Sequence, residues 1–278
     1  MSKVKKGTMF LLAAIFAFML LFLGAVTFLP KQQVFAAGEG TVYWGVSGGK
    51  LTISSSEVGG TESGSFPANE HWVRDTDSKW RKSSFTSVEV TDGVAPLSTA
   101  YWFYGKTNLT SVDLSGLVTA NVTDMSSMFY LCRSLTEIDL SAFNTENVTS
   151  FDSMFAECAK LTYIDISSFS TASATDISGM FYNCSKLSGT FGIEGTAIKI
   201  GTKFNTANVT DMSNLFGGCK KLTYLDISSF NTAKVTSMRN LFYNCSLLSG
   251  TFGATGTAIK IGSDFSTSNV TNMSYMFG

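Results

Sequence analysis

Two hydrophobic periods alternate along most of the chain, and together they predict a stack of similar coils. In residues 161–166 the apolar positions follow L-x-x-I-x-I, which predicts a short strand whose alternate residues face inward. In residues 122–132 the apolar positions are spaced by 3, 4 and 3 residues, which predicts the buried stripe of a short helix. Asn121 or Thr123 stands where it could cap that helix.

The same pattern returns in frames of 26 residues. NVTDMSSMFYLCRSLTEIDLSAFNTE occupies 121–146, and NVTSFDSMFAECAKLTYIDISSFSTA follows at 147–172. Self-similarity at a period of this length is the signature of a stacked array. We therefore expect an α/β repeat solenoid over residues 95–278, made of leucine-rich-repeat coils with one short strand and one short helix each.

Two later frames are nine residues longer and carry nearly the same glycine-rich insertion, at 188–201 and 249–262. Glycines flanked by β-prone residues predict a protruding loop or hairpin. If the Ile-Lys-Ile segments at the ends of these insertions replace the strand of the coil, Lys199 and Lys260 lie near its outward aspartates.

Residues 37–94 lack the repeat and predict a small β-rich cap at the N-terminal end of the solenoid. Residues 41–54 form two β-prone runs around Gly48-Gly49, which predicts a hairpin, and residues 84–90 predict another strand. Residues 59–65 predict a polar loop. Three tryptophans are candidates to cover the open apolar end of the first coil: Trp44, Trp72 and Trp80.

Residues 1–36 are typical of a secretory signal peptide. Lysines precede an apolar run from Met9 to Leu29, and small residues before Ala37 suit cleavage. The run is also long enough to span a bilayer, so an uncleaved membrane anchor is the alternative. Removing residues 1–36 leaves 16 basic and 21 acidic residues, a formal charge of −5, which argues against a nucleic-acid partner.

The five cysteines all end a Met/Leu-Phe-x-x-Cys segment, and we interpret them as packing residues. Each is expected at the buried end of the predicted helix. Because neighbouring helices pack roughly 8–10 Å apart, disulfides between coils are disfavoured. The cysteines are therefore predicted to be buried and reduced.

The sequence shows no evident catalytic, metal or cofactor site. The only histidine, His71, lies outside the repeats, and no spacing of Ser, His and Asp or of paired cysteines suggests chemistry. We therefore predict that the protein is not an enzyme. The eight Asn-x-Ser/Thr sequons are predicted not to carry glycans, because the repeat needs a turn and a cap at such positions.

The outward strand positions form two columns that are candidates for ligand contact. Inward packing of the Leu and Ile residues forces the residues between them out, and exposed tyrosine beside acid is a plausible contact surface. The candidate ligand-contact residues are Glu137, Asp139, Tyr163, Asp165, Tyr224 and Asp226.

The repeat resembles that of BspA-like leucine-rich-repeat surface proteins of bacteria, through MFYLCRSLTEIDLSAFNTENVTSFDSMF and its later copies. Phe143 and Phe169 depart from the general pattern, because they stand where an Asn/Cys ladder residue is usual. The resemblance implies a secreted or cell-surface adhesion module that binds a protein or glycan of a host or neighbouring cell. The alternative is a structural spacer that displays another domain from the cell wall. The chain ends within a repeat, without a cap or sorting signal, so we expect a solenoid truncated at its C-terminal end.

Overall fold

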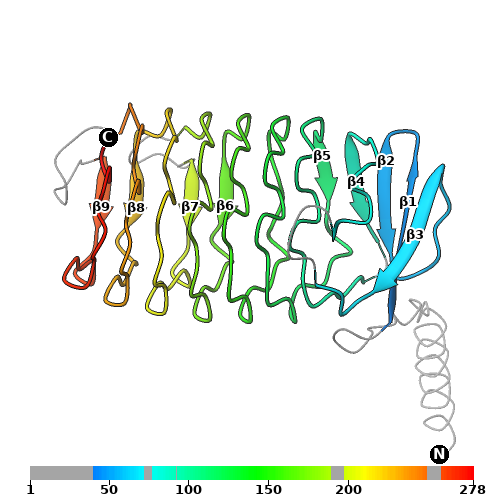
Figure 1. Cartoon of the computed structure of the whole chain (residues 1–278), viewed down its shortest axis with the longest axis horizontal. Helices are drawn as coiled ribbons and strands as arrows, with labels where there is room; N and C mark the ends of the chain where they lie inside the picture. Colours follow the sequence, from blue (N-terminus) through cyan, green and yellow to red (C-terminus); the bar gives the residue numbers. More distant parts are fainter. Residues whose placement is uncertain (1–39, 72–76, 92, 189–196, 249–257) are drawn as a thin grey trace, which may run out of the picture. The chain divides into compact units, whose positions relative to one another are not determined.

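The computed structural model describes residues 40–71, 77–91, 93–188, 197–248 and 258–278 (Figure 1). The predicted signal peptide, Trp72 and most of both insertions, where a protruding loop or hairpin was predicted, lie outside these residues. In the described part of the chain, no helix has the length and apolar character needed to cross a membrane.

The N-terminal segment and the first coil share one five-stranded sheet, ordered β3-β1-β2-β4-β5. Its strands are β1 (Thr41–Ser47), β2 (Lys50–Ser54), β3 (Glu62–Pro67), β4 (Ser87–Val90) and β5 (Ser111–Asp113). The hairpin predicted at 41–54 is confirmed, because β1 and β2 pair antiparallel across two glycines with φ of 55° and 76°. The strand predicted within 84–90 is confirmed by β4. The loop predicted at 59–65 is wrong in part, since β3 begins there and pairs with β1.

The repeat region is a β-solenoid whose coils stack in chain order (Figure 1). β6 (Ile164–Ile166) pairs in parallel with β7 (Ile198–Ile200), and β8 (Leu225–Ile227) pairs in parallel with β9 (Ile259–Ile261). A second ladder of single parallel bridges joins every coil to the next, through Ser98, Asp124, Ser150, Asp176, Asp211, Ser237 and Asn272. The Leu and Ile residues of the strands, together with columns of Met, Phe and Cys, fill the interior.

The helix predicted in each coil is wrong, and with it the α/β leucine-rich-repeat fold. No α-helix occurs in the described ranges. The N–H of Ser127 donates to the carbonyl of Asp152 at 2.8 Å, and the N–H of Phe129 donates to that of Met154 at 2.9 Å, both in the next coil. Amides that bond to the next coil cannot close the internal i to i−4 bonds of a helix. Tight turns, such as the bond from the Cys132 N–H to the Phe129 carbonyl at 3.1 Å, produce the 3, 4, 3 spacing instead.

Left-handed residues explain why these segments do not continue as helices. Ser127 and Leu131 have φ of 56° and 64°, and equivalent positions of later coils share this conformation. Left-handed backbone interrupts a right-handed helix and is easiest for glycine and asparagine. Those residues fill several of the later positions, namely Gly179, Asn183, Asn214, Gly218, Asn240 and Asn244.

The residues interpreted as helix caps instead bond from coil to coil. The amide of Asn147 donates to the carbonyl of Ala120 at 2.8 Å, and Asn208 and Asn269 repeat this contact with their preceding coils at 2.8 and 2.7 Å. The hydroxyl of Thr149 donates to the carbonyl of Thr123 at 3.0 Å. The repeated Asn-Val-Thr is therefore accounted for by inter-coil hydrogen bonds.

The cysteines are buried free thiols, as predicted, but the distance argument against disulfides is wrong. Coils joined by backbone hydrogen bonds lie only about 4.8 Å apart, not the 8–10 Å of packed helices. Each thiol donates to a phenylalanine carbonyl of the preceding coil, as Cys158 does to Phe129 at 3.3 Å. The rings of that Phe column also stack, with Phe129 and Phe155 centroids 5.7 Å apart. Phe143 and Phe169 form a second stacked pair at 6.2 Å.

Tryptophans cover the first coil, as predicted for two of the three candidates. Trp80 is fully buried, and its ring stacks on Phe103 of the first coil with centroids 6.3 Å apart. Trp44 packs edge-on against Trp80 at 6.0 Å. The apolar end of the solenoid is thereby closed by the N-terminal segment.

Lys106 ties this segment to the first coil from the column that later coils fill with cysteine. Its ammonium donates to three backbone carbonyls, those of Trp80 at 2.7 Å, Arg81 at 2.9 Å and Ser83 at 2.8 Å. The residue is 9% exposed, and burial lowers the pKa of Lys106 to about 8.

Candidate functional site

The outward face of the short strands brings several predicted contact residues together. In β6, Ile164 and Ile166 are buried and Asp165 points outward between them. β7 lies beside β6 in register, so that Lys199 stands opposite Asp165. The placement of Lys199 beside the aspartate column is confirmed. The same register places Lys260 opposite Asp226.

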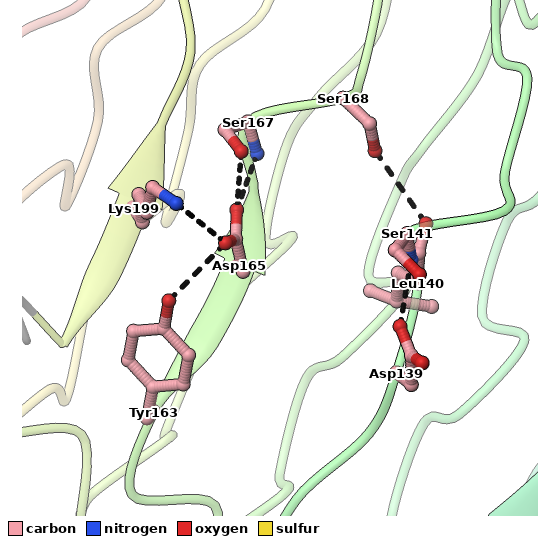
Figure 2. A network of polar contacts seen from close by, with 8 residues as sticks. All are labelled: Asp139, Leu140, Ser141, Tyr163, Asp165, Ser167, Ser168 and Lys199. Atoms are coloured by element: carbon pink, nitrogen blue, oxygen red, sulfur yellow. Dashed lines mark hydrogen bonds and ion pairs between the residues drawn. The ribbon is translucent and has the colours of Figure 1, made fainter.

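Asp165 is the centre of a polar network (Figure 2). Its Oδ2 accepts bonds from Lys199 Nζ at 2.9 Å and from the Tyr163 hydroxyl at 3.3 Å. Its Oδ1 accepts bonds from the backbone N–H and the hydroxyl of Ser167, at 2.9 and 2.6 Å. Partial burial acts to raise the pKa of Asp165, but the bonds from Lys199 and Ser167 outweigh it and lower the pKa to about 2.

The same network is repeated around Asp226. Lys260 Nζ donates to its Oδ2 at 2.8 Å, and the hydroxyl of Tyr224 lies 3.5 Å from the same oxygen. The two tyrosines differ in accessibility, because Tyr163 is 39% exposed and Tyr224 only 7% exposed. The prediction that Tyr224 is exposed is therefore wrong. Strand alternation fixes which way a side chain points, but it does not fix what neighbouring coils place over it.

Glu137 and Asp139 are exposed, as predicted, but they differ from Asp165 in having no cation beside them among the described residues. In that part of the chain, Asp139 accepts a bond from the N–H of Ser141 at 2.9 Å, and Glu137 has no polar partner. Hydrogen bonds from the hydroxyl and N–H of Ser141 lower the pKa of Asp139. Asp139 is therefore charged at neutral pH, and no described lysine or arginine forms an ion pair with it or with Glu137.

These carboxylates line a hollow of about 510 Å³ between β5 and β6. The coil between the two strands contributes residues 137–141, which form no strand. Val112 and Ile138 supply half-buried apolar surface, and Tyr163 supplies an aromatic ring. The hollow combines four of the six predicted contact residues, and Tyr224 and Asp226 do not line it.

The hollow offers carboxylates, apolar surface and an aromatic ring, which can contact a ligand without reacting with it. No group of three or more His, Cys, Asp or Glu side chains in the described residues is placed to hold a metal ion. The sequence did not reveal the hollow, because E-I-D-L-S at 137–141 keeps the alternation of S-V-D-L-S at 111–115, which contains β5. The sequence analysis also did not predict that Lys106 bonds to the N-terminal segment. The presence of a lysine where later coils have a cysteine was a signal for such a role.

Comparison with known proteins gives a family but no individual relative. No curated protein and no solved structure matches the chain. A family described as "Mycoplasma protein of unknown function, DUF285" matches residues 97–195 and again residues 196–278. The two matches cover most of the repeat region and more than half of the chain. The protein therefore belongs to the DUF285 family.

Proposed function

We propose that this protein is a secreted or cell-surface binding module that adheres to a protein or glycan of a host or neighbouring cell. The observation that carries the proposal is the hollow on the strand face. It joins an exposed tyrosine, apolar surface and two unneutralised carboxylates within one concave site. Concave sites that combine apolar surface with a few polar groups are typical of ligand binding.

Two features of the sequence support an extracellular setting. The N-terminal lysines and the apolar run to Leu29 are typical of an export signal or a membrane anchor. The repeat also resembles that of BspA-like bacterial surface proteins. We infer that any contact with a membrane is made through the N-terminal segment alone.

A structural spacer is the second candidate, and the continuous hydrogen bonding between coils favours it. Bridges at Ser98, Asp124, Ser150 and beyond join every coil to the next. Such a stack resists bending, because each bend would have to stretch several of the backbone hydrogen bonds that join neighbouring coils. In this alternative the strand face is a solvated surface without a partner.

The substitution Tyr163→Ala separates the two functions. The labelled full chain is incubated with intact cells and with immobilised matrix proteins and glycans, and bound protein is measured alongside thermal stability. Binding should fall several-fold for Tyr163→Ala, because aromatic contacts carry much of the energy of an interface. Tyr243→Ala is the matched control, since Tyr243 is similarly exposed, at 42%, but lies outside the strands. Unchanged binding of a stable Tyr163→Ala protein, or no binding by the native chain, would favour the spacer.

A further inference from the structure

The hollow lies at a coil without a strand. The outer sheet is also broken between β7 and β8, but those two strands belong to successive coils and no coil without a strand separates them. β5 is the last strand of the five-stranded sheet, and β6 is the first strand of the next. Residues 137–139 between them pair with neither in a ladder, and Ile138 is only half-buried where Ile164 of the following coil is fully buried. The interrupted coil leaves apolar side-chain surface open to solvent on an otherwise polar face.

Negative charge is concentrated at this interruption. In the coils with insertions, lysine neutralises the aspartate column, through the pair of Lys199 with Asp165 and that of Lys260 with Asp226. Asp139 belongs to the same column, and no described lysine or arginine pairs with it or with Glu137. The uncompensated Glu137 and Asp139 therefore both line the hollow.

The walls suit a ligand with an apolar stem and a cationic head. Val112 and Ile138 give an apolar surface on which a hydrocarbon stem can lie, and the exposed ring of Tyr163 stands at the side. A cation over an aromatic ring gains further attraction. Glu137 and Asp139 both line the hollow, and carboxylates favour a planar guanidinium, which offers several donors in a fixed geometry.

We propose that this hollow binds an arginine side chain, or less tightly a lysine side chain, presented by a protein partner. The proposal rests on the proposed binding function and narrows its partner to a protein with a basic surface segment. A neutral or acidic glycan lacks the cation that Glu137 and Asp139 would pair with. The lysine-neutralised network at Asp226 does not have this affinity.

The test uses two blocked peptides, acetyl-Gly-Ser-Arg-Ser-Gly-amide and the same peptide with citrulline in place of arginine. Citrulline keeps the shape of the side chain and removes its charge. Binding to the full chain is followed by NMR chemical shifts at low and high salt. The arginine peptide should bind at least about tenfold more tightly than the citrulline peptide, and the difference should shrink as salt screens the charges.

The matched variants are Glu137→Gln with Asp139→Asn in the hollow, and Asp226→Asn in the equivalent column outside it. The first pair keeps side-chain shape, and the amide that replaces the Asp139 carboxylate still offers an oxygen to the N–H of Ser141, so the fold is retained. It should abolish the preference for arginine, while Asp226→Asn should leave the preference unchanged. Equal binding of the two peptides, or an equal effect of Asp226→Asn, would overturn the proposal. So would calcium ions that bind the hollow and displace the peptide at millimolar concentration, since the site would then be one for metal ions.

The peptide experiment and the cell-binding experiment can fail separately, so their results distinguish the two proposals. If cell or matrix binding depends on Tyr163 but the arginine peptide shows no preference, the binding function stands and the basic partner is wrong. If neither cells nor matrix bind and the peptide also fails, both proposals are overturned.

Discussion

Alkaline pH should unfold this protein through its five cysteines. Each thiol is buried and donates to a phenylalanine carbonyl of the preceding coil, with sulfur to oxygen distances between 3.0 and 3.3 Å. A thiolate cannot donate this bond, and burial leaves it without solvation. Burial accordingly raises the pKa of all five thiols, and that of Cys245 to about 11.

The direction of this change in stability follows from the coupling between proton binding and folding. A folded pKa above the unfolded value gives stability that is complete below the unfolded pKa and is lost as pH rises through the window between the two. A thiol with an ordinary pKa of about 9 favours the unfolded chain by about 1.4 kcal/mol at pH 10, so five thiols give about 7 kcal/mol. Lys106 acts in the opposite sense, because its pKa is lowered to about 8, but it restores at most about 2 kcal/mol after allowance for solvent screening. The net loss of about 5 kcal/mol is comparable with the whole stability of many domains.

The assay is urea unfolding at pH 8, 9 and 10 with a reducing agent present, followed by the fluorescence of the buried tryptophans. The double variant Cys158→Ala with Cys184→Ala should start less stable but lose only about three fifths of the thiol-linked stability, about 4 kcal/mol. Val148→Ala is the control, because it opens a cavity in the same core without removing a titrating group. An unchanged pH dependence in the double cysteine variant would refute the reasoning. Rapid thiol labelling of the native protein at pH 8 would refute it as well.

Individual contacts give three more testable changes. Lys106→Met should lower the free energy of unfolding by about 2–4 kcal/mol in urea unfolding, because three carbonyls, two of them buried, lose the bond that the ammonium donates. Lys199→Ala should raise the pKa of Asp165 from about 2 toward its ordinary value in an NMR titration, while stability changes by less than about 1 kcal/mol because the pair is exposed. Gly218→Ala should lower the free energy of unfolding by about 1–3 kcal/mol in thermal unfolding, since its φ is 77° and an added Cβ would clash with the Asn183 amide oxygen. Gly48→Ala is the control, because Gly48 also has a positive φ, of 55°, but has open space around it, so it shows the conformational cost without the clash.

Local sequence patterns were sufficient to predict the period of the array and the direction of most of its side chains. The alternation around Ile164 and Ile166 is a local property of an extended chain, so it predicted both the buried residues and the outward Asp165. The hairpin at 41–54 was predictable for a similar reason, because its two glycines specify the turn. The position of Lys199 followed from the repeat itself, once its Ile-Lys-Ile segment was aligned with the strand of the preceding coil.

The backbone bonding of each coil, in contrast, depends on contacts between coils. The 3, 4, 3 spacing of apolar residues in 122–132 is compatible with a helix and with successive tight turns. The choice depends on whether an amide such as that of Phe129 finds its acceptor four residues back or in the next coil. Recurring Asn and Gly at left-handed positions were a visible signal for the second arrangement, but the pairing itself joins residues about one period apart.

The candidate site was likewise predictable only in part from local sequence patterns. Local alternation placed Glu137 and Asp139 on the outer face, but it could not show that their coil leaves the sheet, since this depends on pairing with the coils on either side. It also could not distinguish the exposed Tyr163 from the buried Tyr224, whose local sequences are nearly identical. Direction is determined by the chain's own backbone, whereas burial, pairing and hollows are determined by the neighbours that the fold brings alongside.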